Sequence, residues 1–340
     1  MNTLAIPFGL VGLAGCWSAT AAGFGWVRWS VEPFWLIAGV ALIWLLGAHT
    51  YRGHRATGTL LAQLREPAQG PVAAIVPITI MLFGAHLFPV WPVVGSILVY
   101  SGAALAVLFG AWLVSQWIQR PVPAESIHGG FFLPTVAAGF IGAEATAVVG
   151  NPDLAVVAFG MGALFWVVIF TIVLARLAVI SPLPGPLTPT LAILAAPPAV
   201  GGMAWLAMNG RVVDGFSVVL LGSTSFMVLI QIALVPTYRR LAFSLGFWSF
   251  TFSAAAVASQ VILLSGIARY PGWQVVTVTA LSAVSILILL ITVKSVTAWR
   301  RPAQGVRNEE AQLASADERV ERPRVNGRHQ PPTSEDIHEH

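Results

Sequence analysis

Charged side chains are scarce in this chain of 340 residues, of which only 9% are Asp, Glu, Lys or Arg. Soluble domains carry about 25% charged residues, so most of this length cannot form a water-facing globular surface. Eight of the 18 basic and eight of the 14 acidic residues lie within positions 294–340. We therefore exclude a large soluble domain, and we interpret the net charge of +4 as a topology signal and not as a nucleic-acid-binding surface.

Cysteine is also nearly missing, because Cys16 is the only one. A single thiol allows neither a disulfide framework nor a cysteine-based metal site. The sequence contains no HExxH motif, no GxSxG motif and no Cys/His cluster, and an intramembrane enzyme would need such a group. We expect no enzymatic activity, no cofactor and no physiological metal site.

Apolar residues are abundant at 56%, and they fill ten stretches of the chain. Each stretch is near the ~20 residues that a helix needs to cross ~30 Å of hydrocarbon. The sequence predicts an all-α integral membrane protein with a transmembrane domain over 1–297, and a disordered polar cytoplasmic tail over 298–340. The spans run approximately over 6–27, 33–50, 72–90, 92–118, 131–150, 153–176, 189–209, 215–236, 244–267 and 272–297.

Arginine placement predicts the orientation of these spans. Seven arginines fall in the loops after spans two, four, six and eight, and three fall on the opposite side. By the positive-inside rule both termini are cytoplasmic, and we expect a multi-pass protein of the cell membrane, plasma or inner. The first set is Arg52, Arg55, Arg65, Arg120, Arg176, Arg239 and Arg240, and the second is Arg28, Arg211 and Arg269.

Prolines that fall inside a span all lie in odd-numbered spans. A proline inside a helix removes a hydrogen bond and kinks the helix, and a bilayer tolerates the freed groups only beside protein or a water-filled cavity. Short links on the outer side favour five helical hairpins. We expect kinked odd helices around a central pore and straight even helices outside them. The interior prolines are Pro7, Pro77, Pro134, Pro197 and Pro198.

Two titratable side chains within the apolar spans are functional candidates, Glu144 in span five and His86 in span three. An intramembrane carboxylate is a functional hypothesis by default, so Glu144 is a candidate for proton coupling. The alternatives are a protonated carboxyl group hydrogen-bonded between helices and an interfacial position. His86 is a candidate either for a hydrated position at the outer mouth or for a functional position in the pore. It would form a proton relay if it faced Glu144.

Three segments carry a family resemblance. Residues 182–200, which include Ala196-Pro197-Pro198, resemble the "L.P…..APP.." signature of the tellurite-resistance/dicarboxylate transporter family. Residues 243–252 resemble its "F…WW.YTFP" segment, and residues 6–13 resemble its opening "P..fg..lG". The resemblance covers about residues 4–297 and includes bacterial and yeast transporters and plant slow anion channels.

The resemblance implies a ten-helix protomer whose kinked odd helices ring a pore, assembled as a homotrimer. It also implies that the aromatic residue at the position of Phe252 plugs the pore. The sequence departs from the family at the next position, where Ser253 stands in place of proline. Span nine is therefore expected to be straighter here than in its relatives.

The resemblance further implies membrane transport of small anions. The implied substrates are C4-dicarboxylates such as malate, monovalent inorganic anions, sulfite and tellurite-related oxyanions. A channel needs no coupling residue, whereas a proton-coupled carrier would use a titratable group such as Glu144. A membrane sensor that signals through its tail is a further alternative.

Overall fold

The computed structural model describes residues 2–55 and 60–300. Residues 1–292 form one compact unit, and residues 293–300, the last turns of α11, belong to a second. The predicted cytoplasmic tail lies outside the described residues from position 301 onward.

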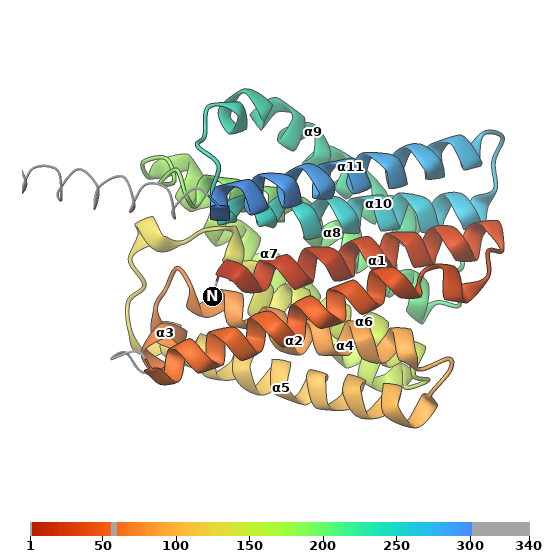
Figure 1. Ribbon diagram of the computed structural model, residues 1–340, viewed down its shortest axis with the longest axis horizontal. Helices are drawn as coiled ribbons and strands as arrows, with labels where there is room; N and C mark the ends of the chain where they lie inside the picture. The colour runs from red at the N-terminus through yellow and green to blue at the C-terminus, as the bar shows by residue number, and fades with distance from the viewer. Residues whose placement is uncertain (1, 56–59, 301–340) are drawn as a thin grey trace, which may run out of the picture. The chain divides into compact units, whose positions relative to one another are not determined.

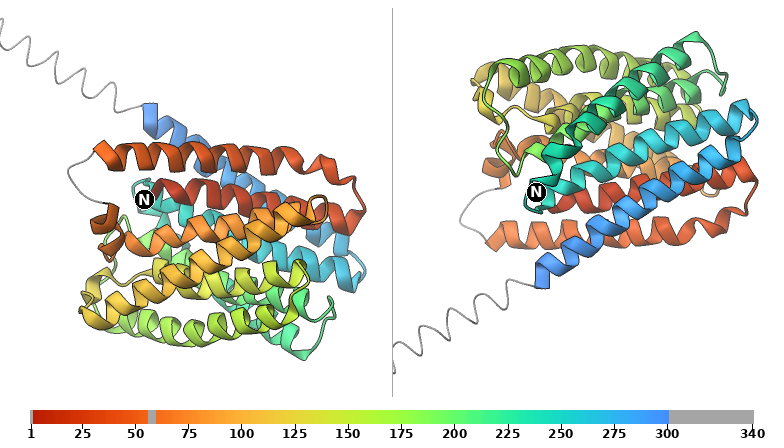
Figure 2. Two further views of the ribbon diagram at one scale, coloured as in Figure 1. Left: turned by 90° about the horizontal axis from the view of Figure 1, so that it is seen from below. Right: turned by 90° about the horizontal axis from the view of Figure 1, so that it is seen from above.

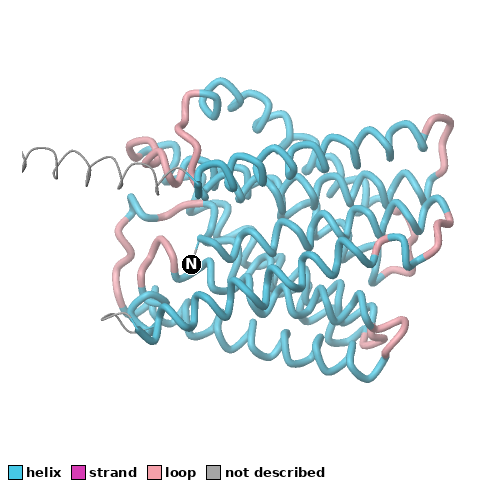
Figure 3. Tube along the Cα trace, in the orientation of Figure 1, coloured by secondary structure: helices cyan, strands magenta, loops and turns pink. Residues whose placement is uncertain are grey.

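Ten helices in the described ranges are long and apolar enough to cross a membrane, which confirms the predicted all-α class (Figures 1 and 3). A short helix, α3 (Leu60–Arg65), lies in the first long loop and was not predicted. The main helices are α1 (Ala5–Phe24), α2 (Glu32–Arg55), α4 (Ile75–Leu87), α5 (Pro92–Gln119), α6 (Ala138–Val148), α7 (Pro152–Val179), α8 (Ala196–Met208), α9 (Gly215–Arg239), α10 (Ser249–Ala268) and α11 (Trp273–Arg300).

Odd-numbered spans are composite, whereas each even-numbered span is a single α-helix. Every odd span begins with a 3₁₀-helical segment and then continues as an α-helix, and in span five a π-helical segment lies between the two. The initial segments are η1 (Asn2–Leu4), η3 (Gly70–Ala74), η5 (Gly129–Phe132), η7 (Thr188–Ala195) and η8 (Leu245–Trp248), all 3₁₀-helical, and the π-helical η6 (Leu133–Ala137) follows η5.

The prolines of the odd spans mark these junctions. Pro7 and Pro77 lie in the first turns of α1 and α4, and Pro197 and Pro198 open α8. The amide groups of a first turn have no intrahelical acceptor, so proline is tolerated there. Pro134 lies within the π-helical segment η6. The prolines therefore stand where the helix type changes.

One expectation about proline was wrong. Pro236 lies inside α9, an even-numbered helix, because that helix extends to Arg239 and does not end at the proline. Span nine begins with a 3₁₀ segment, Leu245–Trp248, and α10 then continues without interruption through Ser253. That this span is straighter than in its relatives stays a prediction. The break at the start of this span therefore does not depend on a proline at position 253.

Burial separates the two sets of helices. Between 44% and 78% of the apolar windows of the odd spans are buried, against 11% to 28% for the even spans. The α-helices of the odd spans contact one another in a closed cycle: α1 with α4, α4 with α6, α6 with α8, α8 with α10, and α10 with α1. The odd spans are thus the inner helices of the unit. Two even-numbered spans, α5 in the left view of Figure 2 and α9 in the right view, lie in front of the other helices.

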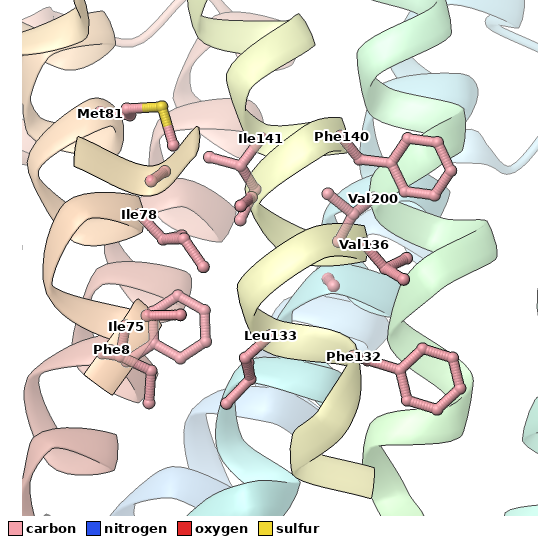
Figure 4. Packing of buried hydrophobic residues seen from close by; sticks show 14 of the residues in the cluster. Phe8, Ile75, Ile78, Met81, Phe132, Leu133, Val136, Phe140, Ile141 and Val200 are labelled. Atoms are coloured by element: carbon pink, nitrogen blue, oxygen red, sulfur yellow. The ribbon is translucent and has the colours of Figure 1, made fainter. Parts of the chain in front are cut away.

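Each outer helix packs on its neighbour in sequence. Contacts join α1 with α2, α4 with α5, α6 with α7, and α8 with α9. A buried cluster on α10, which includes Ala258 and Ile262, packs with Leu281 and Val284 of α11. The largest core cluster joins the inner helices, and Figure 4 shows part of it, including Phe8, Ile78, Ile141 and Val200.

Candidate functional site

Two cavities lie among the inner helices, one toward each end. The narrow cavity, of about 80 Å³, is lined by residues at the starts of the inner spans, including His128, Leu187 and Gly246. The wide cavity, of about 440 Å³, lies toward the short turns at the other end and is lined by Arg28 and Arg211 among others.

Phe252 and Val200 line both cavities. Phe252 comes from α10 and Val200 from α8, so two neighbouring inner helices supply the boundary between the cavities. The residue that the family resemblance singled out as a plug is therefore at the boundary.

The Phe252 ring stacks on the ring of Phe8, with centroids 3.7 Å apart and an angle of 11° between the planes. Phe8 is buried, comes from the first turn of α1 and lines the narrow cavity. Sequence reasoning did not assign a role to Phe8 or Val200. The signal available for Phe8 was its place in the opening motif, one residue after Pro7.

Glycine allows α1 to approach α10 beside this aromatic pair. A Cβ atom at Gly9 would overlap with Thr251 Oγ1, and one at Gly12 would lie 3.2 Å from Phe252 Cδ2. The first of these contacts is sterically forbidden, so the backbone of α1 needs glycine at position 9. The Phe8–Phe252 stack therefore depends on close helix packing.

His128 is the titratable side chain in the lining of the narrow cavity. Its Nδ1 accepts a hydrogen bond from the Gly130 amide at 3.0 Å, and its Nε2 donates to the Ala68 carbonyl at 3.1 Å. Burial lowers the pKa of His128 to about 4. His128 is therefore neutral at pH 7, and the narrow cavity carries no charge from it.

Glu144 and His86, the two predicted proton-coupling residues, both line the wide cavity. The structure pairs His86 with Glu32, since His86 Nε2 lies 3.0 Å from Glu32 Oε2. Among the described residues no hydrogen bond or ion pair to Glu144 is formed. A relay between His86 and Glu144 thus remains a prediction.

His86 belongs to a cluster at the mouth of the wide cavity. The Trp35 ring stacks on the His86 ring with centroids 4.0 Å apart, and Arg28 donates a hydrogen bond to the His86 carbonyl. Arg28 Nε lies 3.4 Å from Glu32 Oε1. Because α2 and α4 meet only in the fold, sequence could not reveal that Glu32 is the partner of His86.

Ser253 follows the boundary residue and lines the narrow cavity. Its Oγ donates to the Ser249 carbonyl at 3.0 Å. A serine that bonds back to the carbonyl four residues earlier can bend a helix slightly. This hydroxyl is a polar group where the family has a proline ring.

These features define a multi-pass helical membrane protein with two cavities whose linings share an aromatic residue. A family model described as voltage-dependent anion channel, SLAC1, matches residues 1–296, and the chain belongs to this family. The resemblance inferred from the motifs is confirmed, and membership places the chain among anion channels and transporters.

Curated relatives agree with the family assignment. The chain is 28% identical over 256 residues to the tellurite resistance protein TehA homolog of Haemophilus influenzae, covering 75% of this chain and 78% of that protein. It is 26% identical over 157 residues to the S-type anion channel SLAH2 of Arabidopsis thaliana, and 25% identical over 161 residues to the guard cell S-type anion channel SLAC1 of the same plant. The alignments with these plant channels cover 46% of this chain and 30% and 29% of the plant proteins.

Proposed function

We propose that small anions cross the membrane through the ring of inner helices, passing from the wide cavity to the narrow one, and that Phe252 blocks the passage at rest. The observation that carries this proposal is that Phe252 and Val200 line both cavities. An apolar constriction without room for water is a barrier to an ion, and displacement of the ring would open it.

Weak dipoles provide the anion preference in this proposal. The initial 3₁₀ segments of the inner spans begin beside the narrow cavity, at residues such as Gly130 and Leu245. Amide groups at helix starts favour negative charge without a fixed cation, and weak binding lets the ion leave again. Transfer from water costs more for a divalent than for a monovalent ion of similar size, so we propose that chloride and nitrate pass more readily than malate or sulfite.

Anion flux in proteoliposomes tests the proposal. Phe252→Ala removes the ring from the boundary, and we expect chloride flux to rise at least about tenfold, because an apolar barrier of ~1.4 kcal/mol or more is lost. The matched control is Phe250→Ala on the same helix, whose ring packs edge-on against Tyr238 and lines neither cavity. Equal flux in the two variants and the wild type would contradict the plug.

A proton-coupled carrier is the second candidate, favoured by the placement of Glu144 in the wide cavity without a partner among the described residues. In that case chloride uptake moves protons, and Glu144→Gln abolishes the proton movement. Asp153→Asn is the control, since Asp153 is exposed at the start of α7. Anion flux that moves no protons and is unchanged by Glu144→Gln leaves the channel as the mechanism.

Orientation and assembly belong to the same proposal. We propose that both termini are cytoplasmic, so the wide cavity opens to the outside of the cell membrane and the narrow cavity to the cytoplasm. We also propose a homotrimer with one path in each protomer. The mass of the detergent-solubilised protein, measured by light scattering with the detergent contribution subtracted, tests the trimer.

A further inference from the structure

Arg211 lies in the turn between α8 and α9 and lines the wide cavity. The residue is exposed, and its backbone has a φ of 63°, in the left-handed region that side chains other than glycine rarely adopt. Such a conformation persists where the surrounding structure imposes it. The turn therefore fixes the backbone position from which the Arg211 side chain contributes to the lining of the wide cavity.

Neighbouring residues hold the turn by hydrogen bonds. The Arg211 amide donates to the Leu206 carbonyl at 2.8 Å, and Gly210 supplies a second left-handed residue with a φ of 71°. The Asn209 side chain donates to the Val212 carbonyl at 2.8 Å and accepts from the Val212 amide at 3.2 Å. These contacts use the backbone of the turn and do not involve the guanidinium group of Arg211.

The acidic groups near Arg211 form no ion pair with it within the described part of the chain. Asp214, three residues later, accepts hydrogen bonds from Trp205, from Ser217 and from Asn209. In the part of the chain that the structure describes, Arg211 forms no ion pair. Glu144 in the same cavity interacts with Arg211 only through space. Among the described residues no acceptor occupies the guanidinium N–H groups of Arg211, so these donors can bind a mobile anion.

Arg28, the other arginine in the cavity lining, is different because it has partners. Its Nε pairs with Glu32, and it also donates to the His86 carbonyl. An arginine that already faces a carboxylate attracts a further anion weakly, because the two charges largely cancel at a distance. Of the two arginines, Arg211 is thus the one without an ion-pair partner among the described residues.

We propose that the wide cavity is an anion-capture site in which Arg211 binds and concentrates small inorganic anions before they reach Phe252. This inference rests on the proposed anion pathway and adds the residue that recruits its substrate. A charged group at a pore mouth raises the local concentration of counter-ions and the rate at which they enter.

Iodide quenching of tryptophan fluorescence tests capture without requiring conduction. Trp26 is 45% exposed and lines the wide cavity, so iodide held near Arg211 can quench it. At ~10 mM ionic strength, where the Debye length is about 30 Å, we expect Arg211→Gln to lower iodide quenching and leave quenching by neutral acrylamide unchanged. In a Trp26→Phe background, Arg211→Gln should change iodide quenching less than it does when Trp26 is present. Arg211→Lys keeps the positive charge and should therefore keep most of the iodide quenching of the wild type.

Arg269→Gln is the matched control. Arg269 also has a positive φ, of 44°, and lies in a turn at the same end, but its guanidinium faces the Trp273 ring at 5.8 Å and it does not line the wide cavity. Chloride current provides the second measurement. Arg211→Gln should lower it about threefold at 20 mM chloride and have little effect at 1 M, where the Debye length is about 3 Å.

The outcomes separate the two proposals. If Arg211→Gln and Arg269→Gln give the same iodide quenching, capture at Arg211 is wrong even where Phe252→Ala raises current. If quenching falls only in Arg211→Gln while Phe252→Ala carries no extra current, the capture site stands and the proposed pathway fails.

Discussion

His128 joins the start of the fifth span to the loop between the second and third spans through both of its ring nitrogens. The Nδ1 atom accepts a hydrogen bond from the Gly130 amide, so a proton on Nδ1 would face the N–H of Gly130 and the hydrogen bond would be lost. The histidine was not singled out from the sequence, because a single histidine before two glycines is a weak pattern. Its burial and its bond to Ala68, 60 residues away, arise only from the fold.

Protonation of His128 should destabilise the protein at acid pH. The folded pKa of about 4 lies below the ordinary value of 6.5, so the unfolded chain binds more protons between these values. The stability that neutral His128 contributes is complete above about pH 6.5 and is lost as the pH falls toward 4, by about 3 kcal/mol in total. Unfolding temperatures of the wild type and His128→Ala measured from pH 7 to 4.5 check this.

A flat pH response of the wild type over that range would contradict the assignment. His128→Ala should be less stable than the wild type at pH 7 and closer to it at pH 4.5, because the alanine has no proton to bind. Glu125→Gln, an exposed change three residues before His128, is the control for general effects of charge near this loop.

Among individual residues, the sequence singled out Phe252 as a plug and Glu144 and His86 as possible proton-coupling residues. The structure brings all three to a cavity lining, and their roles stay predictions. The partners of these residues could not be predicted. Phe8 stacks on Phe252 across 244 positions of the chain, and Glu32 pairs with His86 across 54. Such pairs depend on which helices become neighbours, and hydrophobic periodicity carries no information about that.

At the scale of helices, close packing of α1 on α10 supports the aromatic boundary. Gly9→Ala would drive a Cβ atom against Thr251, whereas a Cβ atom at Gly15 would meet nothing within 4 Å. We expect Gly9→Ala to destabilise the protein by about 1–3 kcal/mol, as overpacking does, and to raise anion leak by displacing Phe8 from Phe252.

Gly15→Ala in the same helix is the matched control. It should be neutral or slightly stabilising, because alanine favours the helix by up to about 1 kcal/mol. Thermal unfolding and chloride leak of the two variants test the pair, and equal behaviour would show that the α1–α10 approach does not govern the boundary.

The ten spans were predictable because each requires a long apolar run, which the sequence displays directly. The composite form of the odd spans was only partly predictable. Proline marked four of the five, but the 3₁₀ start of span nine, at Leu245–Trp248, occurs without one. Proline at the end of α9 was also misjudged, since helix ends in an apolar run are poorly marked.

For the whole molecule, the inner helices that form the closed cycle of contacts also line both cavities. Apolar composition predicts that the spans enter a bilayer, but it does not determine the order in which they meet. The placement of the prolines nevertheless indicated which spans are more buried, because irregular backbone must be covered by protein in a membrane.

Removal of residues 303–340 distinguishes a transporter from a sensor. We expect the truncated protein to keep its chloride flux within about twofold, since the cavities and their boundary lie entirely within residues 5–263. Flux in proteoliposomes, normalised to the amount of protein inserted, measures this. Loss of flux on truncation would assign the tail a part in transport.

The central claim is that anions cross the boundary formed by Phe252 and Val200. The most direct test is to introduce Val200→Cys together with Phe252→Ala and to apply a charged thiol reagent from the wide-cavity side during a current recording. The native Cys16 is fully buried, so Phe252→Ala alone serves as the unreactive control. We predict irreversible block of the current in the double variant only, and an unchanged current there would contradict the account.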